Sequence, residues 1–180
     1  IDIKLAINQF EQAELMRKLE SGGLSPEEEE ELRRRLAALK QAELQLKVEK
    51  LDAEETEIMR RLESGMLTPQ EAEELRKRLA QLQQDRIALE IEKLDLEQAE
   101  LERRIATGLL TSEEEEKARR RLAALGIERI ELKLKALDCE QVEIHRLLES
   151  GLLKPSEEAA LRKRLEQIEK DRVTLQIQAI

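Results

Sequence analysis

The sequence predicts an all-α protein, an up-and-down antiparallel array or bundle of about five helices, three long and two half-length, built from four 43-residue repeats. The repeats show first in four turn segments that recur every 43 positions, marked by Gly22, Gly65, Gly108 and Gly151. Self-similarity at such a period is typical of stacked repeat units. Only six glycines and three prolines occur in 180 residues, which leaves room for few loops. Charged residues make up 41% and apolar residues 40% of the chain, a composition typical of long helices.

Each turn combines the end of one helix with the start of the next. Glycine follows the last helical residue, where a left-handed backbone is favoured because glycine has no Cβ. We therefore expect hairpin turns at residues 22–25, 65–68, 108–111 and 151–154, within a single repeat domain that spans residues 1–180.

The residues after each glycine are typical of a helix start. Ser25, Thr68 and Thr111 fit the N-cap position, and Pro26 and Pro69 fit the first helical position. Three residues after each cap a glutamate predicts a capping box; these glutamates are Glu28, Glu71 and Glu114. The fourth copy carries Lys154 at the cap position, so its helix start should be weaker.

Five helices follow from these limits: about 1–21, 26–64, 69–107, 112–150 and 155–180. Short turns make neighbouring helices antiparallel. The first half of each long helix should pack on the preceding helix and the second half on the next. The first and last helices, at about half length, should each cover one half of their neighbour.

An alternative α/β reading, with β-α-α repeats, rests on apolar–polar alternation midway between the turns. Period-two patterns of this kind are typical of strands. The alternating segments are residues 1–5, 44–48, 87–91, 130–134 and 173–177. Asp52, Asp95 and Asp138 would then cap the helices that follow, and Gly126 could end one.

The helical reading is favoured because the supposed strand junctions carry almost no turn residues except Gly126. An apolar stripe with alternating four- and three-residue spacing also runs through the boundary, as in Leu44, Val48 and Leu51. A second stripe enters from the other end of each helix. Where two stripes overlap on nearly opposite faces, they produce an apparent alternation.

One polar position interrupts these stripes in every copy: Gln12, Glu55, Gln98 and Gln141. Such a layer is unfavourable in a dry core. It should be partly exposed or form a polar contact that fixes the register of the helices.

Charge and motifs argue against several functions. The net charge of −9 disfavours a nucleic-acid surface, which needs a clustered basic face. The arginines at 33–35 and 119–121 are interleaved with glutamates, most of them at i−4 spacing, and should form a solvated ion-pair face. We expect no membrane span, because no apolar run approaches about 18 residues, and no signal peptide. The pattern is that of a soluble protein, and it leaves localisation open.

Cys139 and His145 are the obvious candidates for a reactive pair, but their six-residue spacing does not place them on one helix face. A metal site needs three or four ligands, and His145 is the only histidine. No phosphate-binding loop or nucleophile motif occurs. We therefore expect no catalytic, cofactor-binding or metal-binding residues and no enzyme activity.

The copies differ most along one helical face. The three variable positions are 10/53/96/139 (Phe, Ala, Leu, Cys), 13/56/99/142 (Ala, Thr, Ala, Val) and 16/59/102/145 (Met, Met, Glu, His). This variable face is either the wall of a pocket or partner surface, tuned separately in each copy, or a set of positions with unequal surroundings along an array.

Strong caps, leucine stripes and Glu/Lys/Arg faces agree with one another across all 180 residues, as in segment 25–36. Such agreement is a criterion of protein design, and the chain resembles de novo, computationally designed helical-repeat proteins. Cys139, His145 and the imperfect copies depart from the most idealised examples. The resemblance implies a designed structural scaffold with no evolved function, no cofactor and no required partner, produced recombinantly in a cytoplasm. The alternative function is a designed small-molecule or protein binding module that uses the variable face. Exposed stripes would also allow self-association.

Overall fold

The computed structural model describes residues 1–180 and contains five α-helices and no strand. They are α1 (Asp2–Ser21), α2 (Pro26–Glu63), α3 (Pro69–Ala106), α4 (Ser112–Glu149) and α5 (Pro155–Gln178). The three central helices have 38 residues each, against 20 in α1 and 24 in α5. The all-α prediction of three long and two half-length helices is therefore confirmed.

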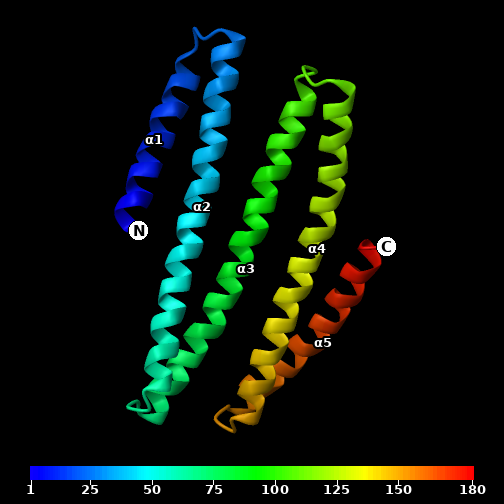
Figure 1. The fold of residues 1–180 in the computed structure, drawn as a ribbon. Helices are drawn as coiled ribbons and strands as arrows, with labels where there is room; N and C mark the ends of the chain where they lie inside the picture. The colour runs from blue at the N-terminus through cyan, green and yellow to red at the C-terminus, as the bar shows by residue number, and fades with distance from the viewer.

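The turns lie where the glycines predict them. Gly22, Gly65, Gly108 and Gly151 have φ between 68° and 72°, the left-handed region in which a Cβ would be strained. Each turn reverses the chain within a few residues. Figure 1 shows the resulting up-and-down order, in which every helix runs antiparallel to its neighbours.

The expected N-caps also form. The side-chain oxygens of Ser25, Thr68 and Thr111 each accept a hydrogen bond of 3.2 Å from the backbone amide three residues later. Only Thr111 has a full capping box. There the Glu114 carboxylate also accepts a 3.1 Å hydrogen bond from the backbone amide of Thr111. The boxes predicted at the other two starts are half formed. Lys154 makes no side-chain cap bond, as expected of the weaker fourth start.

The α/β alternative is wrong. The five alternating segments are helical, and Gly126 together with the three supposed aspartate caps lies inside a helix. The physical reason is the overlap of two apolar stripes. At the middle of a long helix one face meets the preceding helix and another meets the following helix, so Leu44 and Ile87, which start two of the segments, are buried.

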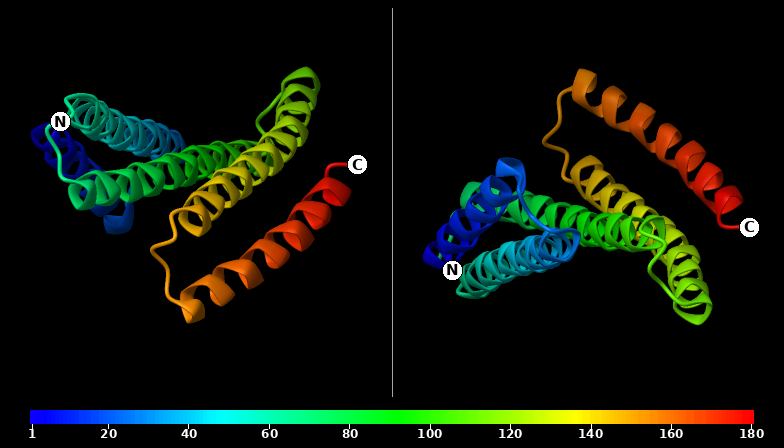
Figure 2. Two further views of the ribbon diagram at one scale, coloured as in Figure 1. Left: turned by 90° about the horizontal axis from the view of Figure 1, so that it is seen from below. Right: turned by 90° about the horizontal axis from the view of Figure 1, so that it is seen from above.

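The helices form a single open layer. Each helix contacts only the helices before and after it in the chain. Figure 2 shows the two termini at opposite ends of the row. In Figure 1, α1 covers the upper half of α2 and α5 covers the lower half of α4. The molecule is thus an array and not a closed bundle.

A single layer leaves a thin core. Only 10 of 180 residues are buried, and Leu82, Leu125 and Ile168 are the largest side chains enclosed completely. Asn8 is the one buried polar residue. Its amide donates a 2.9 Å hydrogen bond to the backbone carbonyl of Leu39 in α2, which satisfies a group that would otherwise be costly to bury.

Candidate functional site

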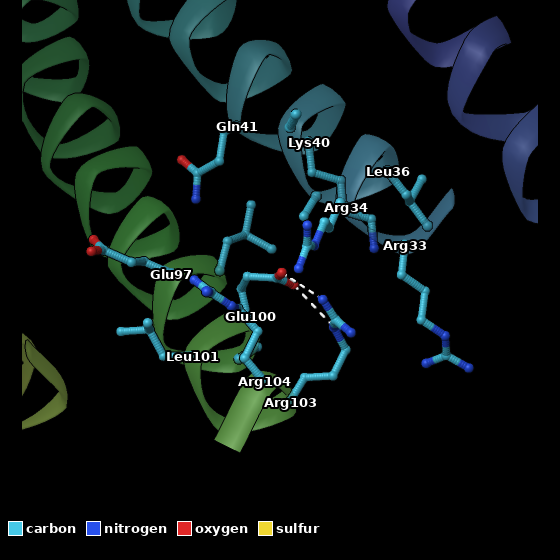
Figure 3. Close-up of a pocket in the computed structure, with 14 residues that line it drawn as sticks. Arg33, Arg34, Leu36, Lys40, Gln41, Glu97, Glu100, Leu101, Arg103 and Arg104 are labelled. Atoms are coloured by element: carbon cyan, nitrogen blue, oxygen red, sulfur yellow. Dashed lines mark hydrogen bonds and ion pairs between the residues drawn. The ribbon is translucent and has the colours of Figure 1, made fainter. Parts of the chain in front are cut away.

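A wide groove lies between α2 and α3, at the end away from the turn that joins them. At this level α2 packs on α1 and α3 packs on α4, and the two middle helices diverge (Figure 1). The space between them is about 800 Å³, lined by residues 33–41 of α2 and 96–104 of α3. Figure 3 shows side chains from both helices facing this space.

An ion pair connects the two walls of this groove. The Arg103 guanidinium in α3 pairs with Glu30 in α2 and also with Glu100 one turn earlier; the second pair is the dashed contact in Figure 3. Hydrogen bonding to Arg103 lowers the pKa of the Glu30 carboxyl below its ordinary value of 4.5. Glu100 and Glu30, in that order, raise the pKa of Arg103. The pair joins two helices that no short turn connects at this end.

The charged side chains that line the groove are unequal in sign. The walls carry five cations and two anions: Arg33, Arg34, Lys40, Arg103 and Arg104 against Glu97 and Glu100. Lys40 and Arg104 take part in no ion pair of the structure, whereas Arg33 is paired with Glu29 at 2.6 Å. Leu36, Leu96 and Leu101 add apolar surface. An apolar wall beside two unpaired cations can hold an amphipathic anion, because burial and charge attraction act on different parts of one ligand.

The same groove recurs between α3 and α4, one repeat later, but is smaller. It measures about 310 Å³, and Cys139 takes the place that Leu96 has in the first groove. Glu73 and Arg146 repeat the bridging ion pair at 2.9 Å. Gln84 donates to the carbonyl of Ala136 at 2.9 Å, which ties α3 to α4 across the groove.

The residues singled out by sequence fall at separate places. Cys139 is half-buried in the α3–α4 groove, and His145 is exposed on the same helix. No three His, Cys, Asp or Glu side chains are arranged to hold a metal ion. The variable face divides: some members line the two grooves, namely Leu96, Ala99 and Cys139, and others are exposed to solvent, namely Phe10, Met16, Met59 and Val142.

The polar layer forms contacts between neighbouring helices, as one of its two interpretations predicts. Each member meets a charged residue 31 positions later. The contacts are Gln12 with Glu43 at 2.7 Å, Glu55 with Arg86 at 3.6 Å, Gln98 with Arg129 and Gln141 with Arg172. In the last three copies the arginine also pairs with an aspartate of the preceding helix: Asp52, Asp95 or Asp138. These contacts fix the helix register, because each arginine reaches two acceptors on one face of the neighbouring helix.

Sequence reasoning predicted ion pairs within a helix but missed the ion pairs between helices. Arg33 and Arg34 form the expected pairs with glutamates four residues earlier. Arg121 instead reaches Glu97 of the preceding helix at 2.7 Å and Glu128 at 2.9 Å. The available signal was that both partners of such a pair recur at the 43-residue period, as Glu54–Arg78 and Glu140–Arg164 do.

Comparison with protein-family models, curated proteins and solved structures gave no match to this chain. None of the five helices has a stretch long and apolar enough to cross a bilayer.

Proposed function

We propose that the chain is a designed structural repeat scaffold with no evolved biochemical function and no enzyme activity. The observation that carries this proposal is the use of the polar side chains. Many of those that point between helices are engaged in architectural contacts that recur at the repeat period, such as Glu30–Arg103 and Glu73–Arg146. A site for chemistry would use polar groups differently in one copy, because a single reaction needs a single constellation.

This proposal predicts that the fold needs no ligand. Purified protein without additives should give the far-ultraviolet circular dichroism of a largely helical chain and unfold on heating. Alanine at Phe10, Met16, Met59 and His145 should leave the helical signal intact, since all four side chains are exposed. A fold that appears only after a cofactor or partner is added would contradict the scaffold proposal.

A second candidate function is binding of an amphipathic anion in the α2–α3 groove. The observation in its favour is the size of this groove, about 800 Å³ against about 310 Å³ one repeat later, together with the unpaired Lys40 and Arg104. The fluorescent probe anilinonaphthalene sulfonate has this chemistry, an apolar body with one anionic group. A titration that saturates at one site would support binding.

The variant Leu96→Glu tests whether that binding uses the groove, because it places a carboxylate in the apolar wall. Leu109→Glu is the matched control, since Leu109 is exposed in a turn outside the groove. Loss of probe binding in the first variant alone would locate the site. Equal binding by both variants would exclude the groove and leave the scaffold as the function.

A further inference from the structure

The array exposes far more surface than a compact protein of its mass. Its solvent-accessible area is 12,162 Å², whereas about 9,000 Å² is expected for a compact monomer of 20.9 kDa. The difference of roughly 3,000 Å² exceeds the ~1,600 Å² that a typical stable protein interface buries. Large apolar side chains are part of this surface at both ends of the row, including Ile7 and Phe10 of α1 and Val173 and Ile177 of α5.

The two ends carry complementary halves of an interface that the chain uses twice internally. Glu30 pairs with Arg103 and, one repeat later, Glu73 pairs with Arg146. These four side chains are only 18–29% exposed. The next glutamate in the series is Glu116 of α4, and no arginine among residues 1–180 lies 73 positions after it.

A second copy offers an arginine at the corresponding repeat position. The four repeats span 172 residues, so the next position in the arginine series corresponds to Arg17 of a following copy. In this structure Glu116 and Arg17 are 63% and 69% exposed and pair only within their own helices. Figure 1 shows that α5 ends beside the middle of α4, so the upper half of α4 has no helix on that side. Glu116 belongs to the first turns of α4, which begins at Ser112.

The next contact in the same interface changes from polar to apolar at the chain ends. Inside the array Gln41 donates to the carbonyl of Lys93, and Gln84 donates to that of Ala136. At the third occurrence the glutamine is replaced by Ile127, which is exposed in α4. The facing position in a following copy is Ile7, also exposed. Two exposed isoleucines thus occupy matching positions on the two ends.

Side-chain size is complementary as well. Leu96 of α3 and Lys40 of α2 both line the α2–α3 groove. One end of the array carries Phe10 at the equivalent of Leu96, and the other carries Gly126 at the equivalent of Lys40. Nothing lies within 4 Å of a Cβ built on Gly126, and its φ is not positive. Glycine inside a helix lowers stability by about 1 kcal/mol relative to alanine. No contact within a single copy requires a glycine at position 126. The ring of Phe10 from a second copy would fill the open space beside it.

We propose that copies of this chain associate head to tail, with α1 of the following copy lying along the amino-terminal half of α4 in the copy before it. Arg17 then pairs with Glu116, Ile7 packs on Ile127, and Phe10 packs over Gly126. The surfaces that meet are different on the two copies, so the association is heterologous and produces a ring or an open filament rather than a closed dimer.

The association displaces the end of α5. Residues 173–180 occupy the same repeat positions as residues 1–8 of the incoming copy. Within these last eight residues only Leu175 is half-buried and the rest are exposed, so their displacement loses little packing. The start of α1 is held more firmly, because Asn8 is buried and hydrogen-bonded to α2. The incoming α1 therefore keeps its place and α5 gives way.

Sedimentation velocity of the full chain over a range of concentrations, up to about 1 mM, tests the proposal. The average mass should rise with concentration and pass that of a dimer. Phe10→Glu should abolish this rise, because it places a charge at the centre of the contact. Val142→Glu is the control: Val142 is exposed to a similar degree on α4 but lies outside the proposed interface. Circular dichroism of both variants should match the parent, since both side chains are exposed.

Charge reversal provides an independent test. Arg17→Glu and Glu116→Arg should each weaken association because like charges then meet, and an equimolar mixture of the two variants should restore it because every junction again pairs opposite charges. A chain that stays monomeric at every concentration would overturn the proposal. So would a mass that stops at the dimer, equal loss in Phe10→Glu and Val142→Glu, or a mixture that associates no better than its components.

Discussion

Replacement of Leu125 by alanine should be among the most destabilising single changes in this protein. Leu125 lies in the amino-terminal half of α4 and is 0% exposed. Removing three carbons loses about 2.4 kcal/mol of transfer free energy at ~0.8 kcal/mol per methylene, and the cavity left behind adds to it, so measured costs for leucine run from about 2.7 to 5 kcal/mol. We expect about 3 kcal/mol, near the lower limit, because helices of a single layer have solvent on two sides and can move together.

Urea denaturation followed by far-ultraviolet circular dichroism measures this loss as a change in the free energy of unfolding. For a chain of this length a loss of ~3 kcal/mol corresponds to a fall in Tm of about 6–12 °C. Leu39→Ala is the internal control, because Leu39 holds the same repeat position in α2 but is only half-buried. A cost below about 1 kcal/mol for Leu125→Ala, or one no larger than that of the control, would refute the idea that the thin core carries the stability.

Three further predictions concern the turns, the caps and the ion pairs. Gly65→Ala should destabilise the fold by about 1 kcal/mol, since Gly65 has φ of 68°. Gly126→Ala should stabilise the fold by ~0.5–1 kcal/mol, because Gly126 lies inside a helix with open space around its Cα. Urea melts in which both variants change the free energy of unfolding in the same direction would contradict this. Lys154→Thr should raise stability by about 1 kcal/mol, because α5 lacks the side-chain cap that the other helix starts after a turn have, and an unchanged denaturation midpoint would disprove it. The ion pair with Arg146 lowers the pKa of Glu73 below 4.5. Its contribution to the free energy of unfolding is therefore present above pH ~4.5 and is lost as pH falls through the lowered pKa. In an acid titration Glu73→Gln should lose stability less steeply than the parent, and identical slopes would argue against the pair.

Local signals in the sequence predicted the helices well. The glycine stops and the hydroxyl caps place the helix limits within about a residue of those observed, because each acts on backbone groups of its own turn. The four-three spacing of Leu44, Val48 and Leu51 correctly outweighed the alternation that suggested a strand. The capping boxes were predicted less well: Thr111 and Glu114 complete one, whereas the glutamates after Ser25 and Thr68 do not return the second bond.

The contacts between helices were harder to predict. The polar layer was expected to be partly exposed or to fix register. The structure shows both: its members are half-buried, and three of them contact Arg86, Arg129 or Arg172. Their aspartate partners are the residues that the α/β alternative would use as helix caps. A sequence pattern shows which residues share a helix face, but it does not show which face of the neighbouring helix they meet, since that depends on the crossing of two rods set by packing along their whole length.

The sequence by itself determined the number, length and order of the helices, because caps, breakers and apolar spacing act over a few residues. Only the tertiary structure decided that the five helices form an open row instead of closing into a bundle. It also decided that the α2–α3 groove is about 800 Å³ while its repeat counterpart is about 310 Å³. Both outcomes depend on side chains that are far apart in the chain and line one space only after folding: Leu96 and Lys40 in one groove, and Cys139 and Gln84 in the other.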